Sequence, residues 1–226
     1  MNEFLSLVSI QVNDKIYLKD PESSDLGKKI IRGSIELIHE IGFESFTFRK
    51  LAKQINSTEA SIYRYFESKH KLLLYLTNWY WAWMEYRIIF SIANIDSAKE
   101  RLGRALKLLT EEYTNGEKVD YIDTLKLYHI VISESSKSYL IKEVDEVNKK
   151  GAFLAFKNLV ARLSEIILEI NPDYKYPHML ISTVVEGAHH QYFFAEHLPR
   201  LTDKVKGENS ISNFYKELVF KSIENN

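Results

Sequence analysis

Residues 47–69, TFRKLAKQINSTEASIYRYFESK, are the stretch that decides the fold of this chain. Thr47 stands directly before a helical pattern, where its hydroxyl can cap the free backbone N–H groups of a helix. Leu51 and Ile55 then fall four residues apart and, with the alanine between them, form a narrow apolar stripe. Asn56 interrupts this pattern, and Asn tolerates the left-handed backbone that ends a helix in a sharp turn.

A second short helix follows the turn. Thr58 can cap it, and Ile62 and Phe66 would form its inward face because they lie four residues apart. The opposite face carries polar and aromatic side chains, namely Glu59, Ser61, Tyr63, Arg64 and Tyr65. Two short helices joined by so tight a turn predict a helix-turn-helix, whose second helix can enter a DNA major groove.

Composition sets the limits of the other possibilities. The 226 residues are 45% hydrophobic and 27% charged, as in an ordinary globular protein long enough for a substantial core. The chain contains no Cys, which excludes disulfides, thiolate metal sites and cysteine nucleophiles. No apolar run approaches the roughly 20 residues of a membrane span, and the start lacks a basic signal region, so we expect a cytoplasmic protein with no membrane partner.

Charge is distributed unevenly along the chain. The formal net charge is −1, but residues 28–75 contain nine basic and five acidic residues and so carry +4, which leaves −5 on the rest. A basic module on an acidic body is typical of a protein that touches phosphate with one end only.

Residues 30–73 resemble the DNA-binding domain of the tetracycline-repressor (TetR) family of bacterial transcriptional regulators. The resemblance rests on positions that match without a gap: Ile31, Ile35, Ile38, Gly42, Phe43, Thr47, Leu51, Ala52, Ile62, Tyr63, Arg64, Tyr65, Phe66, Ser68, Lys69 and Leu72. Two positions depart from the family pattern, since Asn56 replaces the usual Gly and Ser57 a small apolar residue. Asn is the best substitute for Gly in a left-handed turn, so the geometry is retained.

The resemblance implies a double-stranded DNA operator as partner and assigns the contacts by position. Residues 57–61 would lie near base edges; Glu59 can accept from cytosine N4, and Ala60 can meet a thymine methyl. Arg64 can reach a base or a phosphate, whereas Tyr63, Tyr65, Thr47 and Lys69 would contact phosphates, unless the two tyrosines are packing residues instead. The full predicted DNA-binding set is Thr47, Arg49, Lys50, Ser57, Thr58, Glu59, Ala60, Ser61, Tyr63, Arg64, Tyr65 and Lys69.

The rest of the chain predicts an all-α fold of about nine helices, because Gly and Pro are scarce and helical spacing recurs. Besides the helix-turn-helix, we expect helices over residues 22–41, 68–90, 96–113, 120–135, 139–170 with a break near 149–151, 177–198 and 210–223. Residues 1–20 alternate in polarity, which predicts a short β-hairpin or an extended arm that packs on the body or on a partner subunit, or reaches a groove. The predicted domains are this arm (1–20), the DNA-binding domain (21–75) and a ligand-binding and dimerisation domain (76–226).

The family resemblance also implies a homodimer through the last two helices and a small-molecule effector that controls a repressor, with no cofactor and no enzymatic activity. Aromatic residues of the body suggest an apolar or flat effector, although each can equally be core packing. The predicted ligand-binding set is Trp79, Trp83, Tyr86, Tyr128, His129, Phe153, Phe156, His189 and Phe193.

Two alternative functions remain open, a metal protein and a DNA-binding protein without a ligand. Glu67-x-x-His70 and Glu186-x-x-His189 match the spacing of di-iron bundles, and Glu186, His189, His190 and His197 of the 177–198 helix could instead sense a metal. Such histidines are more often hydrogen-bonded core or interface residues. The other reading is an architectural DNA binder without a ligand, for which so large and aromatic a body is not needed.

Overall fold

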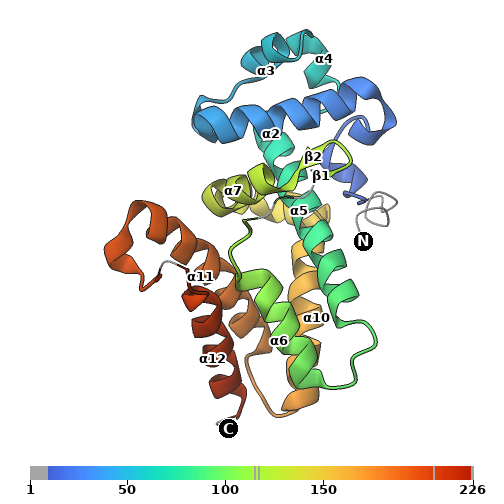
Figure 1. The fold of residues 1–226 in the computed structure, drawn as a ribbon. Coiled ribbons are helices and arrows are strands. Elements are labelled where there is room, and N and C mark those ends of the chain that lie inside the picture. Colours follow the sequence, from blue (N-terminus) through green and yellow to red (C-terminus); the bar gives the residue numbers. More distant parts are fainter. Residues whose placement is uncertain (1–9, 115, 117, 206, 225–226) are drawn as a thin grey trace. The chain divides into compact units, whose positions relative to one another are not determined.

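A computed structural model describes residues 10–114, 116, 118–205 and 207–224 of the chain. By packing, the chain divides into two compact units, Met1–Ala82 with Tyr113–Leu154 and Trp83–Glu112 with Ala155–Asn226. The predicted domains 1–20, 21–75 and 76–226 remain predictions, because they are defined by motifs whereas these units are defined by packing. The all-α fold is confirmed: the described residues form α-helices, short 3₁₀ turns and one two-stranded sheet (Figure 1).

The first unit contains, in chain order, η1 (Asp14–Ile16), η2 (Pro21–Ser23), α2 (Asp25–Ser45), α3 (Phe48–Gln54), α4 (Glu59–Tyr63), β1 (Lys118–Val119), β2 (Ile122–Asp123), α7 (Thr124–Glu134), α8 (Ser136–Tyr139) and α9 (Val144–Lys149). Helix α5 (Lys69–Ile92) begins in this unit and continues into the second.

Helix α2 is the central element of the first unit, where it packs against α3 and α7. Ser24 caps it by accepting a hydrogen bond from the Gly27 N–H at 3.2 Å. The predicted core face is confirmed, with Ile31, Ile35 and Ile38 at most 2% exposed. Near its end the helix is interrupted at Gly42, where φ is +75° and ψ 157°, a backbone conformation open mainly to glycine.

Residues 10–20 do not form the predicted β-hairpin. They contain the 3₁₀ turn η1 and a bend at residues 18–19 and form no strand, whereas the earlier part of the predicted hairpin lies outside the described residues. The reason is local: the Asn13 side chain accepts from the Lys15 N–H at 2.9 Å, and such side-chain bonds compete with strand pairing. The alternative prediction, an extended arm packed on the body, agrees with the burial of Ile16.

The two-stranded sheet lies where the sequence predicts the start of a helix. Lys118 pairs with Asp123 and Val119 with Ile122, around a turn in which Asp120 has φ +54°. Helix α7 therefore begins only at Thr124, capped by Asp123, whose side chain accepts from the Lys126 N–H at 3.1 Å.

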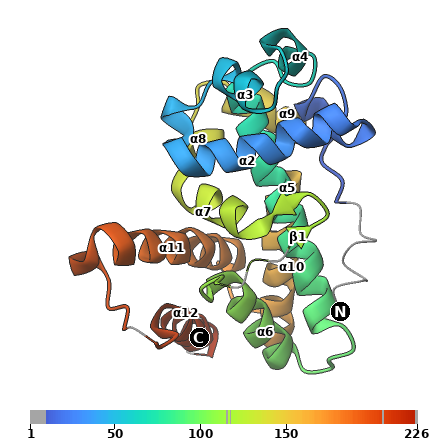
Figure 2. The ribbon, with the colours of Figure 1, turned by 45° about the horizontal axis from the view of Figure 1, so that its top comes forward.

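The second unit contains the end of α5, α6 (Ala98–Thr110), α10 (Leu154–Ile170, of which Leu154 belongs to the first unit), α11 (Pro177–His197), η3 (Pro199–Leu201) and α12 (Ser210–Glu224). Helices α6, α11 and α12 pack against one another, as Figure 2 shows. The Tyr192 hydroxyl donates to the Thr110 carbonyl at 2.9 Å, and the Thr110 hydroxyl donates to Ser212 Oγ at 2.9 Å. These bonds fix the end of α6 against both C-terminal helices.

The helix count and several boundaries need correction. The described residues form eleven α-helices instead of about nine, because the predicted 139–170 helix is divided into α9 and α10 and the short helix α8 lies before it. The break near residue 151 is confirmed, since Gly151 has φ +78°. Helix α6 starts at Ala98 with Ser97 as its cap, later than predicted. Of the described helices, none is long and apolar enough to span a membrane.

Candidate nucleic-acid interface

Helices α3 and α4 form the predicted helix-turn-helix. Thr47 Oγ1 accepts from the Lys50 N–H and Thr58 Oγ1 from the Ser61 N–H, each at 3.2 Å, so both predicted caps are present. Asn56 adopts φ +52° between the two helices, which is the left-handed turn expected of it. Each helix is too short to be stable alone, so packing against its neighbours has to hold it in place.

Buried side chains orient the two helices. Leu51, Ile62 and Phe66 are completely buried, and α3 packs against both α2 and α4. The Phe48 ring meets the Tyr63 ring edge to face at 5.0 Å between centroids, which supports Tyr63 while leaving it 47% exposed. The polar sides of α3 and α4 are thereby held on the surface in a defined orientation.

The exposed side chains of this surface are chiefly those predicted to contact DNA. Thr47, Arg49, Lys50, Thr58, Ala60, Tyr63 and Arg64 are exposed, and Ser57, Glu59 and Ser61 are half-buried. Arg64 Nη2 donates to Ser61 Oγ at 3.3 Å, and Ser61 Oγ lies 2.8 Å from Thr58 Oγ1. Lys50 Nζ donates to the Ser45 carbonyl at 2.7 Å, so this cation is held close to the start of α3.

Tyr65 and Lys69 have structural partners where the sequence predicts phosphate contacts. Tyr65 is only 3% exposed, and its hydroxyl lies 2.7 Å from Ser24 Oγ at the start of α2. For Tyr65 the structure therefore favours the packing role over the phosphate contact. The two tyrosines differ in exposure because Tyr65 follows the last turn of α4 and faces α2, whereas Tyr63 points outward.

Lys69 binds the end of α2. Its ammonium donates to the carbonyls of Phe43, Glu44 and Phe46 at 3.0, 3.2 and 3.4 Å, and it lies 4.7 Å from the centroid of the Phe43 ring. These carbonyls lie at the end of α2, where the last carbonyls of a helix have no N–H partner one turn further on; the Phe43 carbonyl also accepts from the Phe46 N–H at 3.2 Å. A lysine at this position therefore acts as a C-terminal cap for α2, with an attraction to the helix dipole in addition.

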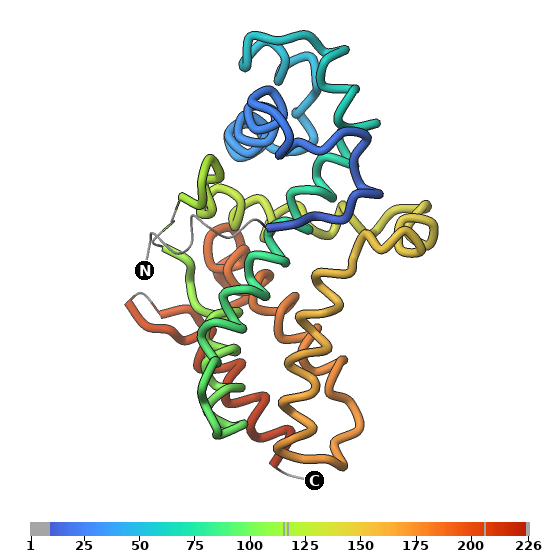
Figure 3. Tube along the Cα trace, turned by 90° about the vertical axis from the view of Figure 1, so that its right-hand side faces the viewer, coloured from blue at the N-terminus to red at the C-terminus, as the bar shows by residue number. Residues whose placement is uncertain are grey.

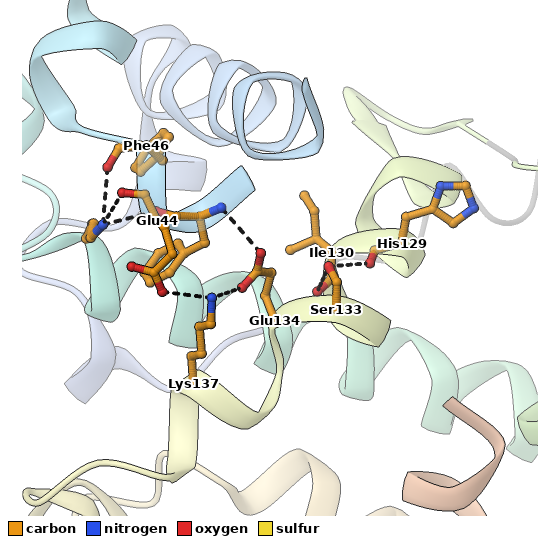
Figure 4. Close-up of polar contacts among 9 residues, drawn as sticks. Glu44, Phe46, His129, Ile130, Ser133, Glu134 and Lys137 are labelled. Atoms are coloured by element: carbon orange, nitrogen blue, oxygen red, sulfur yellow. Dashed lines mark hydrogen bonds and ion pairs between the residues drawn. The ribbon is translucent and has the colours of Figure 1, made fainter. Parts of the chain in front are cut away.

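Helix α7 holds the same end of α2 from the other side (Figure 4). Glu134 Oε1 accepts from the Phe43 N–H at 3.3 Å, and Lys137 Nζ lies 2.7 Å from Glu134 Oε2 and 2.8 Å from Glu44 Oε1. Glu134 is buried, so its charge depends on these two partners. Partial burial lowers the pKa of Lys137, but the hydrogen bonds and charges of Glu134 and Glu44 together raise it by more, so Lys137 stays protonated.

The sequence does not single out Glu134 or Ser24, because their partners lie 91 and 41 residues away. One signal for Glu134 is available in retrospect. It stands four residues after Ile130 and seven after Leu127, on the apolar face of α7, where a carboxylate needs a buried partner.

Two histidines join the middle of α2 to α7. His39 Nε2 and His129 Nδ1 are 3.3 Å apart, and the rings stack with centroids 5.5 Å apart and an interplanar angle of 20°. Partial burial lowers the pKa of His39, the neighbouring His129 and Lys126 lower it further, and Asp123 opposes them. The lowered pKa favours the neutral form of the His39 ring in this contact.

The residues predicted to bind a ligand are divided between the two units. Trp79, Tyr128, His129 and Phe153 belong to the first unit, and Trp83, Tyr86, Phe156, His189 and Phe193 to the second. Within the first unit, Tyr128 lies in a tilted contact with Tyr80 at 6.5 Å between centroids. His129 is exposed, whereas Trp79, Trp83, Tyr128 and His189 are buried. A shared binding site for the nine residues remains a prediction.

The histidines considered for metal sensing belong to α11. His189 is buried, while His190 and His197 are exposed. Burial lowers the pKa of His189 to about 4, with a smaller contribution from His190, so its ring is neutral at physiological pH. Over the part of the chain that the structure describes, no three His, Cys, Asp or Glu residues come close enough to hold a metal ion.

Comparison with known proteins identifies both the motif and the fold. Residues 30–76 match the family described as "Bacterial regulatory proteins, tetR family". No curated protein sequence matches the chain.

Several solved structures share the fold. A regulatory protein in the tetR family from Rhodococcus RHA1 has a TM-score of 0.59 and 14% identity, covering 88% of this chain and 97% of its own. AibR in complex with isovaleryl coenzyme A and operator DNA has a TM-score of 0.57 and 15% identity over 85% and 98% of the two chains. The transcriptional regulator FadR from Bacillus subtilis, in complex with stearoyl-CoA, has a TM-score of 0.57 and 19% identity over 86% and 97%.

Proposed function

We propose that this chain is a ligand-responsive transcriptional repressor of the tetR family of bacterial regulatory proteins, the family that its residues 30–76 match. It would bind a near-palindromic DNA operator as a homodimer and release it when a small molecule binds. The observation that carries the proposal is the capped α3–turn–α4 unit, with basic and polar side chains exposed on a buried apolar base. The protein acts by binding and has no catalytic role, and it works in the cytoplasm, where its operator lies.

Exposure and chemistry divide the tasks of the interface. Thr58, Ala60 and Ser61 at the start of α4, with Ser57 and Glu59, face base edges, and Arg64, which directly follows α4, is the one long cation of residues 57–65. Tyr63, Thr47, Arg49 and Lys50 contact phosphates. Phosphate contacts position the protein on DNA, whereas contacts to base edges provide sequence preference.

Dimerisation would use the outer faces of α11 and α12. These helices pack against each other through buried residues, yet Met179 on α11 and Phe214 and Leu218 on α12 remain 66%, 57% and 36% exposed. Phe214 and Leu218 lie four residues apart and so form one stripe. An exposed apolar stripe on α12, with an exposed methionine on the adjacent α11, favours a four-helix interface around a two-fold axis.

The ligand is the least defined part of the proposal. AibR and FadR were solved with isovaleryl coenzyme A and stearoyl-CoA, so acyl coenzyme A thioesters are the first class to test. A ligand of this class would change DNA affinity only if it binds the DNA-free and DNA-bound states with different affinities.

The primary test is selection of bound sequences from random double-stranded DNA, followed by binding measurements at several salt concentrations. We expect a short palindrome whose half-sites are separated by about one helical turn, roughly 34–36 Å. Tyr63→Ala should weaken binding to all sequences, and Arg64→Ala should also change the preferred bases. The control is Lys175→Ala, which removes an exposed charge from the other unit. Salt-sensitive binding without any enriched sequence would overturn the proposal.

The dimer and the ligand need separate tests. Phe214→Glu should yield a monomer in analytical ultracentrifugation, whereas Asn213→Glu on the same helix should leave the dimer intact; a wild-type monomer at micromolar concentration would refute the assembly. Acyl coenzyme A thioesters of increasing chain length should raise the melting temperature, because a ligand that binds only the folded state stabilises it. The thioester that stabilises most should also release the operator.

A further inference from the structure

The segment of residues 13–20, NDKIYLKD, precedes the helix-turn-helix and is bound at both of its ends and in its middle. We call it the N-terminal strap. Figure 3 shows it in dark blue beside the start of α5. The family match begins only at residue 30, so the motif assigns no task to the strap.

One end of the strap is bound to the exit of α4. The Leu18 N–H donates to the Tyr65 carbonyl at 2.8 Å, and Lys19 Nζ lies 5.1 Å from the centroid of the Tyr65 ring. Tyr65 follows α4 by two residues, and Ser24 binds its hydroxyl. The backbone, the ring and the hydroxyl of Tyr65 are therefore each held by the polypeptide that precedes α2.

The other end of the strap is bound to the connection between α9 and α10. Asn13 Nδ2 donates to the Lys150 carbonyl at 2.9 Å, while the same side chain caps η1 through its oxygen. Gly151 leaves room for this contact, because a Cβ there would lie 2.6 Å from Asn13 Nδ2. Gly151 also has φ +78°, so both the backbone and the close approach require glycine.

The middle of the strap is anchored in the core of the first unit. Ile16 is 3% exposed, and the Tyr17 ring meets the Tyr75 ring edge to face at 6.0 Å between centroids. The strap carries two lysines and two aspartates, so its net charge is zero and gives it no electrostatic attraction to phosphate. These contacts favour a segment committed to the protein over an arm that binds DNA.

We propose that the N-terminal strap positions the recognition helix α4, by fixing its exit at Tyr65 relative to the Lys150–Gly151 connection. Leu18 and Asn13 are its positioning residues, and neither contacts DNA. The strap also gives α4 a physical link to the connection that leads into α10, so a movement there would be transmitted to the DNA-reading surface. The inference rests on the proposed DNA-binding function and assigns to it a part of the chain outside the motif.

The test compares Leu18→Pro with Leu18→Ala. Proline removes the N–H that donates to Tyr65, whereas alanine keeps that N–H and trims a side chain that is already 58% exposed. Loss of one hydrogen bond of ordinary strength should lower operator affinity roughly fivefold in the proline variant only. Affinity for random DNA and the salt dependence of binding should stay at the wild-type values, because no phosphate contact is lost.

Asn13→Asp provides the second measurement, which remains decisive if Leu18→Pro fails to fold. Aspartate keeps the oxygen that caps η1 but cannot donate to the Lys150 carbonyl. We expect weaker operator binding with unchanged affinity for random DNA, and wild-type affinity for the charge control Asp14→Asn.

The possible failures are distinguishable. If the wild-type protein selects no operator, the proposed function fails. If it does and all strap variants bind like wild type, the strap has no positioning role. Equal losses on operator and random DNA, with a shallower salt dependence, would instead identify a direct phosphate contact.

Discussion

Replacing the buried Glu134 by alanine should destabilise the end of α2. The substitution removes the acceptor of the buried Phe43 N–H and one of the two carboxylates that bind Lys137. An unsatisfied buried amide costs about 1–3 kcal/mol, and a half-buried ion pair adds about 1 kcal/mol. We therefore expect Glu134→Ala to lower the free energy of unfolding by roughly 2–4 kcal/mol.

Two matched variants separate these contributions. Glu134→Gln keeps an oxygen for the Phe43 N–H and loses only the charge, so it should cost about 1 kcal/mol. Glu44→Ala removes the other partner of Lys137, but the Glu44 side chain is 77% exposed and solvent screens that pair, so the loss should be close to the resolution of the assay.

Two measurements are needed because a chain of two compact units need not unfold in a single step. Urea unfolding gives the overall loss of stability, and hydrogen exchange at the Phe43 amide reports the contact itself. Exchange should be faster in Glu134→Ala and close to wild type in Glu134→Gln. Equal stability and equal exchange in Glu134→Ala and Glu44→Ala would refute the assigned role of Glu134.

Three further predictions concern the same unit. Gly42→Ala should cost about 1–3 kcal/mol in urea unfolding from backbone strain alone, because φ is +75° and an added Cβ meets nothing within 4 Å; a neutral result would show that α2 relaxes there. Thr47→Ala should cost about 1 kcal/mol by removing the cap of α3, whereas Thr47→Ser should retain the stability. Acidification from pH 7.5 to 5.5 should destabilise the protein, because His39 and His189 both have a lowered pKa when folded, so the unfolded chain binds more protons as the pH falls below about 6.5. His39→Asn should reduce this loss, and an NMR titration in which His39 protonates at or above its ordinary pKa would contradict it.

The sequence predicts the helix-turn-helix well because its determinants are local. Thr47 and Thr58 cap the helices that directly follow them, and Asn56 makes its turn with its own backbone. The apolar spacing of Leu51 and Ile62 indicates their inward faces without knowledge of what covers them. Predictions of this kind depend on residues within about one helical turn, so contacts with distant parts of the chain do not change them.

The features that the sequence does not predict depend on distant partners. The alternation before residue 13 indicates a hairpin, but Asn13 instead binds Lys150, which lies 137 residues away. Tyr63 and Tyr65 are both predicted to contact phosphate, and the contacts of Tyr65 with Leu18, Lys19 and Ser24, more than 40 residues away, distinguish the buried one. The start of α7 is displaced for a similar reason, since Tyr121 in the turn before it donates a hydrogen bond to Glu22 at the beginning of the first unit.

The first compact unit is assembled from two separate lengths of chain, and this limits how the protein can be divided. The chain passes from one unit to the other three times, after Ala82, Glu112 and Leu154. A fragment ending near residue 82 would keep the whole family motif and yet lose Glu134, Tyr121 and Lys150, which bind Phe43, Glu22 and Asn13. Exchanging only the motif between relatives would likewise pair the α2 of one protein with the α7 of another, without the matching contact between Phe43 and Glu134. A functional graft would need to carry residues 113–154 together with the motif.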